Sequence, residues 1–92
     1  MIKCVVEFYG TSRELSGLKE IEITLEEGYH LKDLISTLRR QIPALKGPVI
    51  LEEDRLEESH VINLNGRFYY SGDEPMLKDG DRLRFLTLAV GG

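Results

Sequence analysis

Residues 61–70 have the sequence VINLNGRFYY, and they predict the local fold more strongly than any other segment. Asn65 and Gly66 stand between two runs of apolar residues. Asn-Gly is typical of a two-residue type I′ turn, because both turn positions need a positive φ. The turn predicts a β-hairpin with a defined set of opposite residues. These pairs are Leu64 with Arg67, Asn63 with Phe68, and Ile62 with Tyr69.

Two further strands are predicted near the start of the chain. Residues 2–9 (IKCVVEFY) and residues 18–25 (LKEIEITL) alternate between apolar and polar positions, as half-buried strands do. The inward positions of these strands are Ile2, Cys4, Val6, Phe8, Ile21, Ile23 and Leu25. Residues 10–17 (GTSRELSG) separate the strands and predict a loop with room for one helical turn. The two strands should therefore form a hairpin.

The apolar period changes to that of a helix after residue 30. Apolar side chains recur at the i, i+3, i+4 and i+7 positions that share one helix face. They are Leu31, Leu34, Ile35, Leu38 and Ile42. His30 lies at the expected N-cap, and Pro43 should end the helix because proline disfavours helical geometry in the residue before it. The charged run EEDRLEE at residues 52–58 predicts a solvated loop.

The last predicted elements are a tight turn at residues 78–81 (KDGD) and a final strand at residues 82–89. The resulting order is β-β-α-β-β-β, in which one apolar helix stripe can cover one face of one sheet. We expect an α+β fold in two layers, with the final strand beside the first hairpin. Residues 1–92 should form a single domain in which residues 90–92 are a flexible tail.

Composition limits the classes of partner and location. The chain has 92 residues, a formal net charge of −4 and no apolar run near the roughly 20 residues that span a bilayer. Its start does not resemble a signal peptide, and its single cysteine excludes an internal disulfide. These features predict a cytoplasmic protein without a membrane partner. The negative charge argues against nucleic acid and favours a partner with a basic surface.

Motifs for an internal active site are absent from the sequence. It has no glycine-rich phosphate loop, no nucleophile elbow, and no paired Cys or His at metal-binding spacing. Cys4 is expected to be a small buried hydrophobe, and His60 opens a strand without an evident partner. We therefore expect no bound metal, no bound cofactor and no catalytic activity of the chain by itself.

Strand alternation instead predicts an exposed apolar surface. Leu83 and Phe85 share the inward face of the final strand. Arg82 and Arg84 therefore mark the opposite, solvent-facing side, and apolar side chains continue it. The apolar residues expected on that side of the sheet are Tyr9, Phe68, Leu86 and Leu88. Such a patch predicts a docking site for another protein, unless a loop covers it or the protein dimerises there.

The last three residues, Val90, Gly91 and Gly92, suggest the chemistry. Two residues without a Cβ can enter a channel too narrow for other amino acids, and three extended residues reach about 10 Å. They present the carboxylate of Gly92, which is inert until it is activated. An ATP-dependent partner could adenylate it, and a sulfur or amine nucleophile could then attack the mixed anhydride.

Taken in order, several segments resemble the ubiquitin-like β-grasp sulfur carriers of the MoaD/ThiS family, and most of all the small subunits of molybdopterin synthase. The matching segments are MIKCVVEF, RELSG, EEGYHLKDL, VINLNG, LKDGDRLRFL and the final GG. The resemblance covers the whole chain and implies a β-grasp fold, with a mixed sheet of four to five strands on one main helix.

The resemblance also implies a function. Family members carry sulfur as a thiocarboxylate on the last glycine, here Gly92, with Gly91 before it. An E1-like adenylating enzyme activates that glycine with ATP and magnesium, and the tail of the small subunit enters the large subunit of molybdopterin synthase. The family's docking surface corresponds to Tyr9, Phe68 and Leu86, and we expect Leu88 and Val90 to extend it.

Three hypotheses about the function remain open at this point. The chain is a sulfur carrier for molybdenum or tungsten cofactor synthesis, or for another thiolation pathway such as that of thiamine or tRNA. It is alternatively a ubiquitin-like modifier that Gly92 joins to lysines of other proteins, or a β-grasp interaction module whose Gly-Gly end has no chemical role.

Overall fold

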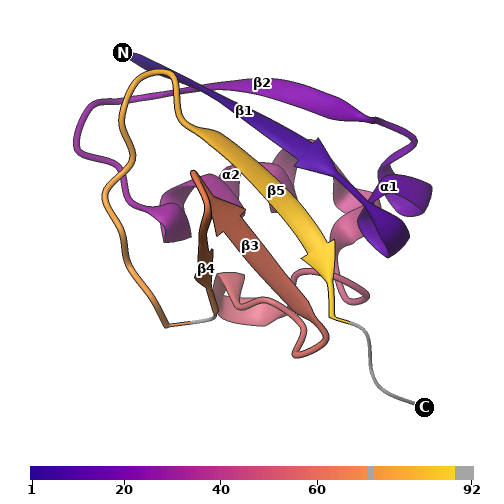
Figure 1. Cartoon of the computed structure of the whole chain (residues 1–92). Coiled ribbons are helices and arrows are strands. Elements are labelled where there is room, and N and C mark those ends of the chain that lie inside the picture. The colour runs from indigo at the N-terminus through magenta and orange to yellow at the C-terminus, as the bar shows by residue number, and fades with distance from the viewer. Residues whose placement is uncertain (71, 89–92) are drawn as a thin grey trace.

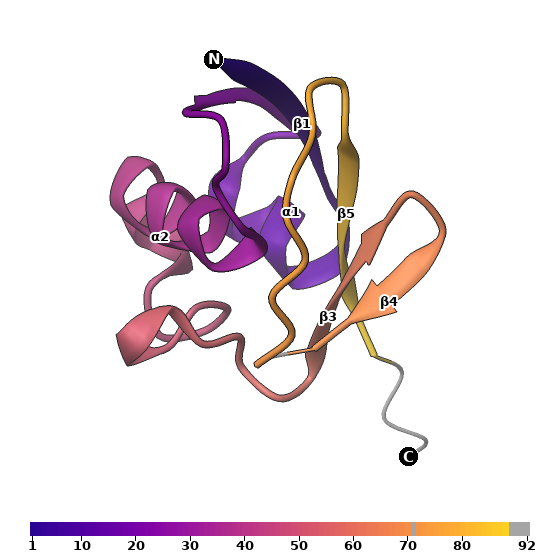
Figure 2. The same ribbon diagram turned by 90° about the vertical axis from the view of Figure 1, so that its left-hand side faces the viewer.

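The structure is a computed structural model that describes residues 1–70 and 72–88. Within these residues a five-stranded sheet forms one layer and helix α2 packs against one of its faces (Figures 1 and 2). The strands are β1 (Ile2–Phe8), β2 (Glu20–Leu25), β3 (His60–Leu64), β4 (Arg67–Tyr69) and β5 (Arg82–Thr87). The helices are α1 (Gly10–Ser16) and α2 (Leu31–Gln41), with 3₁₀ turns η1 (Pro43–Leu45) and η2 (Glu52–Asp54).

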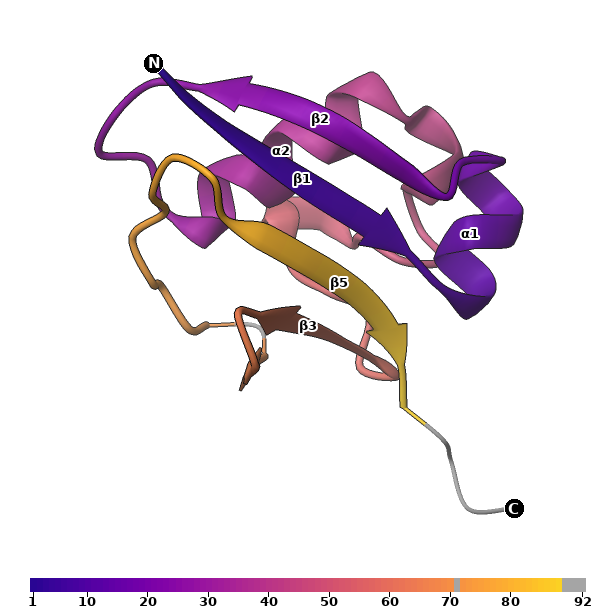
Figure 3. The same cartoon turned by 45° about the horizontal axis from the view of Figure 1, so that its top comes forward.

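The strand order across the sheet is β2-β1-β5-β3-β4. Strand β5 runs parallel to β1, and the other neighbouring pairs are antiparallel. The first and last strands of the chain therefore lie side by side in the middle of the sheet (Figure 3). This arrangement confirms the predicted mixed β-grasp sheet and the position of the final strand beside the first hairpin.

The main core fills the space between the sheet and α2. Alternate residues of β1 are buried, and so are Leu83 and Phe85 of β5. The rings of Phe8 and Phe85 lie 6.0 Å apart between centroids, in a tilted arrangement. The hairpin has the predicted register, with Asn65 at φ 51° and Gly66 at φ 93°. The inward alternation of β5 ends before Thr87, which is exposed.

Residues 10–17 correct the expectation of a loop with one helical turn. They hold α1, a seven-residue helix that ends at Gly17 with φ 71°. The Ser12 hydroxyl donates to the Tyr9 carbonyl at 2.9 Å and so closes the first turn. Only Ser12 of this helix is buried, so the helix has no apolar stripe for sequence periodicity to detect.

Helix α2 agrees with its predicted limits. It begins after His30, whose backbone N–H donates to the Asp33 carboxylate at 2.8 Å. It ends at Gln41, and Pro43 opens the following 3₁₀ turn. The charged run at residues 52–58 differs from a fully solvated loop, because Leu56 within it is buried and bridges to Ile50.

Candidate functional site

The face of the sheet opposite α2 is free of any helix in the described part of the chain (Figure 2). Strand alternation and register define which residues point to this outer face. They are Lys3, Val5 and Glu7 of β1, Glu20, Glu22 and Thr24 of β2, Val61 and Asn63 of β3, Phe68 of β4, and Arg82, Arg84 and Leu86 of β5. This surface is where a partner can approach the sheet directly.

Four of the predicted docking residues can be located, and we call them the apolar patch: Tyr9, Phe68, Leu86 and Leu88. Phe68 is 57% exposed, Tyr9 38% and Leu88 37%, while Leu86 is half-buried. No described segment covers these four residues as a loop would. Val90, Gly91 and Gly92 lie outside the described residues, as does the predicted flexible tail.

The sheet register brings the members of the patch together on adjacent strands. The Tyr9 N–H donates to the Phe85 carbonyl at 3.2 Å, which places Tyr9 beside the end of β5 and Leu86. Leu86 lies opposite Val61 of β3, and Phe68 lies opposite Asn63, two residues further along the same face of β3. Val61 is almost fully buried although no helix covers it, and it packs outside the main core. It was not predicted as part of this surface.

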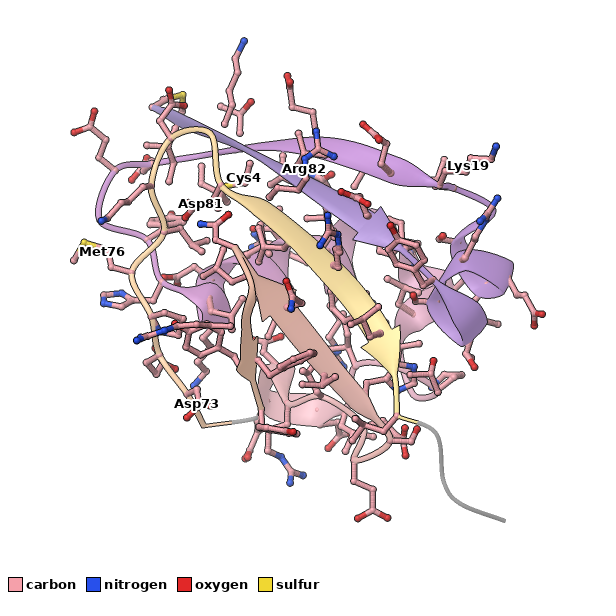
Figure 4. All side chains as sticks on the ribbon, in the orientation of Figure 1. Cys4, Lys19, Asp73, Met76, Asp81 and Arg82 are labelled. Carbon is pink, nitrogen blue, oxygen red and sulfur yellow. The ribbon has the colours of Figure 1, made fainter. Side chains whose placement is uncertain are left out.

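A charged network that sequence reasoning missed lies next to the patch. The Glu7 carboxylate pairs with Arg82 Nη1 at 2.7 Å and with Arg84 Nε at 3.6 Å. It also accepts a hydrogen bond from the Tyr9 hydroxyl. The Tyr9 hydrogen bond and then the Arg82 guanidinium hold the pKa of Glu7 below its usual value. The network fixes the Tyr9 ring and two cations on the outer face, where Figure 4 shows Arg82.

The sequence held a signal for this network. Glu7 and both arginines occupy outward positions of strands that were predicted to be neighbours. The pairing of Glu7 with Arg84 follows only from the parallel register of β1 and β5. The register of β1 and β5 depends on the whole fold, so strand alternation alone could not predict which residues of the two strands lie side by side.

The end of β5 leaves the sheet beside α1 and the turn before β3 (Figure 1). A Cβ on Gly10 would lie 2.9 Å from Thr87 Oγ1, and the positive φ of Gly10, 58°, favours glycine at this position. The Leu88 N–H donates to the Ser59 carbonyl at 2.6 Å. The chain is therefore held by a backbone hydrogen bond at Leu88, with Thr87 beside Gly10, just before residues 89–92 begin.

Two observations concern metal-binding and nucleophilic side chains in the described residues. Residues 1–70 and 72–88 contain no cluster of three or more His, Cys, Asp or Glu side chains arranged to hold a metal ion. Cys4 is buried, and desolvation followed by the charges of Asp81 and Asp79 raises its pKa to about 11. A thiol with such a pKa is a poor nucleophile at neutral pH. None of the described helices has the length and apolar character needed to cross a membrane.

Comparison with known proteins supplies independent evidence. Residues 6–92 match the ThiS family. The chain is 30% identical over 87 residues to a molybdopterin synthase sulfur carrier subunit from Chlamydomonas reinhardtii, a match that covers 95% of each chain.

Solved structures agree in fold. One is a putative molybdopterin converting factor, subunit 1, from Pyrococcus furiosus, with 31% identity, a TM-score of 0.72, and coverage of 97% of this chain and 100% of that one. Another is the small archaeal modifier protein 1 from Methanosarcina acetivorans, with 28% identity and a TM-score of 0.79. That match covers 100% of this chain and 98% of the other.

Proposed function

The chain belongs to the ThiS family of ubiquitin-like sulfur carriers, and on that basis we propose that it carries sulfur as a thiocarboxylate on Gly92. The observation that carries the proposal is the extent of the family match, which runs to residue 92 and so includes both final glycines. In this proposal the sulfur is transferred to a pterin precursor in molybdenum or tungsten cofactor synthesis. The chain is then the small subunit of a molybdopterin synthase. The two relatives with 30% and 31% identity support this branch of the family.

The proposed chemistry proceeds in two steps. An E1-like adenylating enzyme that uses ATP and magnesium binds the outer face and receives the C-terminal segment. The Gly92 carboxylate attacks the α-phosphorus of ATP, pyrophosphate leaves, and the glycine becomes an acyl adenylate. Hydrosulfide then attacks the acyl carbon, the acyl–phosphate bond breaks and AMP leaves, and loss of the sulfur-bound proton gives the thiocarboxylate.

The geometry supports a division of labour between this chain and its partners. Its described residues include the apolar patch beside the Glu7 network, which we assign to docking, while the nucleotide chemistry is assigned to the partner enzyme. Exposed aromatic and aliphatic groups beside fixed arginines are typical of protein interfaces. The same surface serves the adenylating enzyme first and the large synthase subunit afterwards, and one carrier therefore meets two partners in turn.

A second function is supported by one observation. The modifier from Methanosarcina acetivorans is nearly as similar to this chain as the two carrier relatives are. A modifier and a carrier share the activated glycine and differ in the nucleophile, which is a lysine amine for the modifier. The choice between them depends on the acceptor, and not on the chain itself.

Intact-mass spectrometry tests the carrier function. The protein is incubated with its cognate adenylating enzyme, ATP, magnesium and sulfide. We expect a mass gain that corresponds to the exchange of one oxygen for sulfur, and no gain when ATP is omitted or when Gly92 is deleted. Conjugates with other proteins in a cell extract, without the thiocarboxylate, would instead support the modifier.

A further inference from the structure

We propose that Glu57 is a positioning residue that fixes the point from which the C-terminal segment leaves the sheet. It acts through Ser59, whose carbonyl holds Leu88. This inference deepens the proposed function and rests on it, because the segment matters only if Gly92 must reach a partner's active site. Neither the sequence patterns nor the family resemblance assigns a role to Glu57.

The Glu57 carboxylate gathers three donors on one oxygen. Oε2 accepts from the Ser59 N–H at 3.1 Å and from the His60 ring nitrogen Nδ1 at 2.9 Å. It also accepts from the Ser59 hydroxyl. An ionised acceptor makes hydrogen bonds that are roughly twice as strong as neutral ones. The Ser59 hydroxyl, followed by His60, lowers the pKa of Glu57, so the carboxylate stays charged at neutral pH.

Glu57 itself is tied to the core. Its N–H donates to the carbonyl of the fully buried Val49 at 2.8 Å, and its carbonyl accepts from the His60 N–H at 2.9 Å. The second of these bonds closes a turn through Glu58 and Ser59. The position of the carboxylate is therefore set by the core and by the start of β3.

His60 connects the same cluster to the end of β5. It is 3% exposed and lies opposite Thr87 in the β3–β5 ladder. Because Nδ1 faces a carboxylate, Nδ1 carries the proton and Nε2 is the unprotonated nitrogen in the neutral ring. Nε2 has no hydrogen-bond partner among the described residues. His60 therefore acts in this cluster through its bond to Glu57.

The Ser59 carbonyl connects the Glu57 cluster to Leu88. The Ser59 N–H and hydroxyl are both bound to the Glu57 carboxylate, which restricts the residue on the amide side of its Cα. The peptide that carries the Ser59 carbonyl is held by the His60 N–H, which donates to the Glu57 carbonyl at 2.9 Å. The Ser59 carbonyl in turn accepts from the Leu88 N–H at 2.6 Å. Leu88 is the last described residue. A series of bonds thus runs from Val49 through Glu57 and Ser59 to the start of the C-terminal segment.

Positioning of this kind affects reaction more than binding. Docking depends on the outer face, whereas the bond to Ser59 controls the origin of the segment that carries the reacting carboxylate. A displacement of about 1 Å from the productive geometry can cost roughly a hundredfold in rate. Loss of Glu57 should therefore lower kcat for adenylation and leave KM nearly unchanged.

The test compares Glu57→Ala, Glu57→Gln and Glu58→Ala. Glu58 is the exposed neighbour in the same turn and provides a matched control for loss of one negative charge. Hydrogen exchange at the Leu88 amide is measured by NMR, with the amides of β1 as an internal reference. ATP–pyrophosphate exchange with the cognate adenylating enzyme gives kcat and KM for each variant.

In Glu57→Ala we expect the Leu88 amide to exchange at least about fivefold faster, as for loss of roughly one hydrogen bond, with β1 unchanged. In the same variant we expect kcat for adenylation to fall about tenfold and KM to stay unchanged. Glu57→Gln should show smaller changes in both Leu88 exchange and kcat. Glu58→Ala should match the wild type in both measurements. The proposal is overturned by unchanged Leu88 exchange, by equal acceleration in β1, or by faster Leu88 exchange with unchanged kcat. If the enzyme fails to adenylate even the wild type, the proposed function fails, and Leu88 exchange alone decides whether Glu57 holds the segment.

Discussion

Cys4 shows how position in a strand sets the chemistry of a side chain. It lies at an inward position of β1, it is fully buried, and its Sγ lies 3.8 Å from the Lys78 carbonyl oxygen. Strand alternation predicted this burial from the sequence. Desolvation by that burial is the largest cause of the rise of the thiol pKa from 9.0 to about 11. The smaller contributions of Asp81 and Asp79 could not be predicted, because these carboxylates come close to Cys4 only in the folded chain.

The raised pKa of Cys4 predicts a pH dependence of stability. Below pH 9.0 the thiol is protonated in both states, and its contribution to stability is fully present. Between pH 9.0 and about 11 the unfolded chain loses the proton while the folded chain keeps it, so stability falls as pH rises. Urea unfolding across this range should show a steeper loss for wild type than for Cys4→Ala. Equal slopes would contradict the prediction.

The apolar patch yields a second prediction at the residue scale. Phe68→Ala and Leu86→Ala should each weaken binding to the cognate adenylating enzyme by about 1–3 kcal/mol, measured by titration calorimetry, because they remove interface anchors. Phe68→Ala should change the free energy of unfolding by less than about 0.5 kcal/mol, since its side chain is largely exposed. Leu86→Ala should cost about 1 kcal/mol, because Leu86 is half-buried against Val61.

Met76 provides the control for loss of exposed apolar area. It is 57% exposed, as Phe68 is, but it lies in the connection between β4 and β5, away from the outer face (Figure 4). Met76→Ala should leave binding unchanged. If Met76→Ala weakens binding as much as Phe68→Ala does, the partner does not use the outer face in the way we propose.

At the scale of elements, helices and strands were predicted well where a local sequence pattern marks them. Helix α2 and the β3–β4 hairpin were predicted with their limits and register, because an apolar stripe and an Asn-Gly turn are local features. Helix α1 has no such stripe, and its hydrogen bond from Ser12 to Tyr9 is visible only in the fold. Glu57 lies in the charged run at residues 52–58, whose composition indicates only solvent exposure, so its contacts with Ser59 and His60 could not be predicted.

The start of α2 gives a prediction for one element. The Asp33 carboxylate accepts the His30 N–H and lies in the first turn, where a negative charge also interacts favourably with the helix dipole. Asp33→Ala should reduce the free energy of unfolding by about 1 kcal/mol, as loss of a cap does. Asp33→Asn keeps an acceptor and should lose less, as judged by urea denaturation. A stable Asp33→Ala variant would show that this contact does not support the helix.

At the scale of the whole molecule, the proposed function assigns docking to the outer face of the sheet and chemistry to the C-terminal glycine. Strand alternation predicted the outer apolar residues from the sequence, and the final Gly-Gly suggested a reactive glycine, which stays a prediction. It did not predict how the end of β5 is held, because Ser59 is far from Leu88 in sequence. The hydrogen bond from Leu88 to Ser59 is the proposed link between docking on the outer face and the reaction at Gly92.

This separation predicts that a protein lacking Gly92 is a competitive inhibitor. It retains the apolar patch and the Glu7 network, so it should bind the adenylating enzyme with nearly the wild-type affinity. It lacks the reacting carboxylate at the required distance and should not support ATP–pyrophosphate exchange. Added to wild type, it should therefore raise the apparent KM and leave kcat unchanged.

The same deletion combined with Phe68→Ala separates the two contributions. Loss of an interface anchor should weaken inhibition by the roughly 1–3 kcal/mol expected for docking, which corresponds to about fivefold to more than a hundredfold in the inhibition constant. If the Gly92 deletion does not inhibit at all, binding depends on the C-terminal segment rather than on the outer face. The sheet would then serve only to present that segment, and the apolar patch would need another partner to account for its exposure.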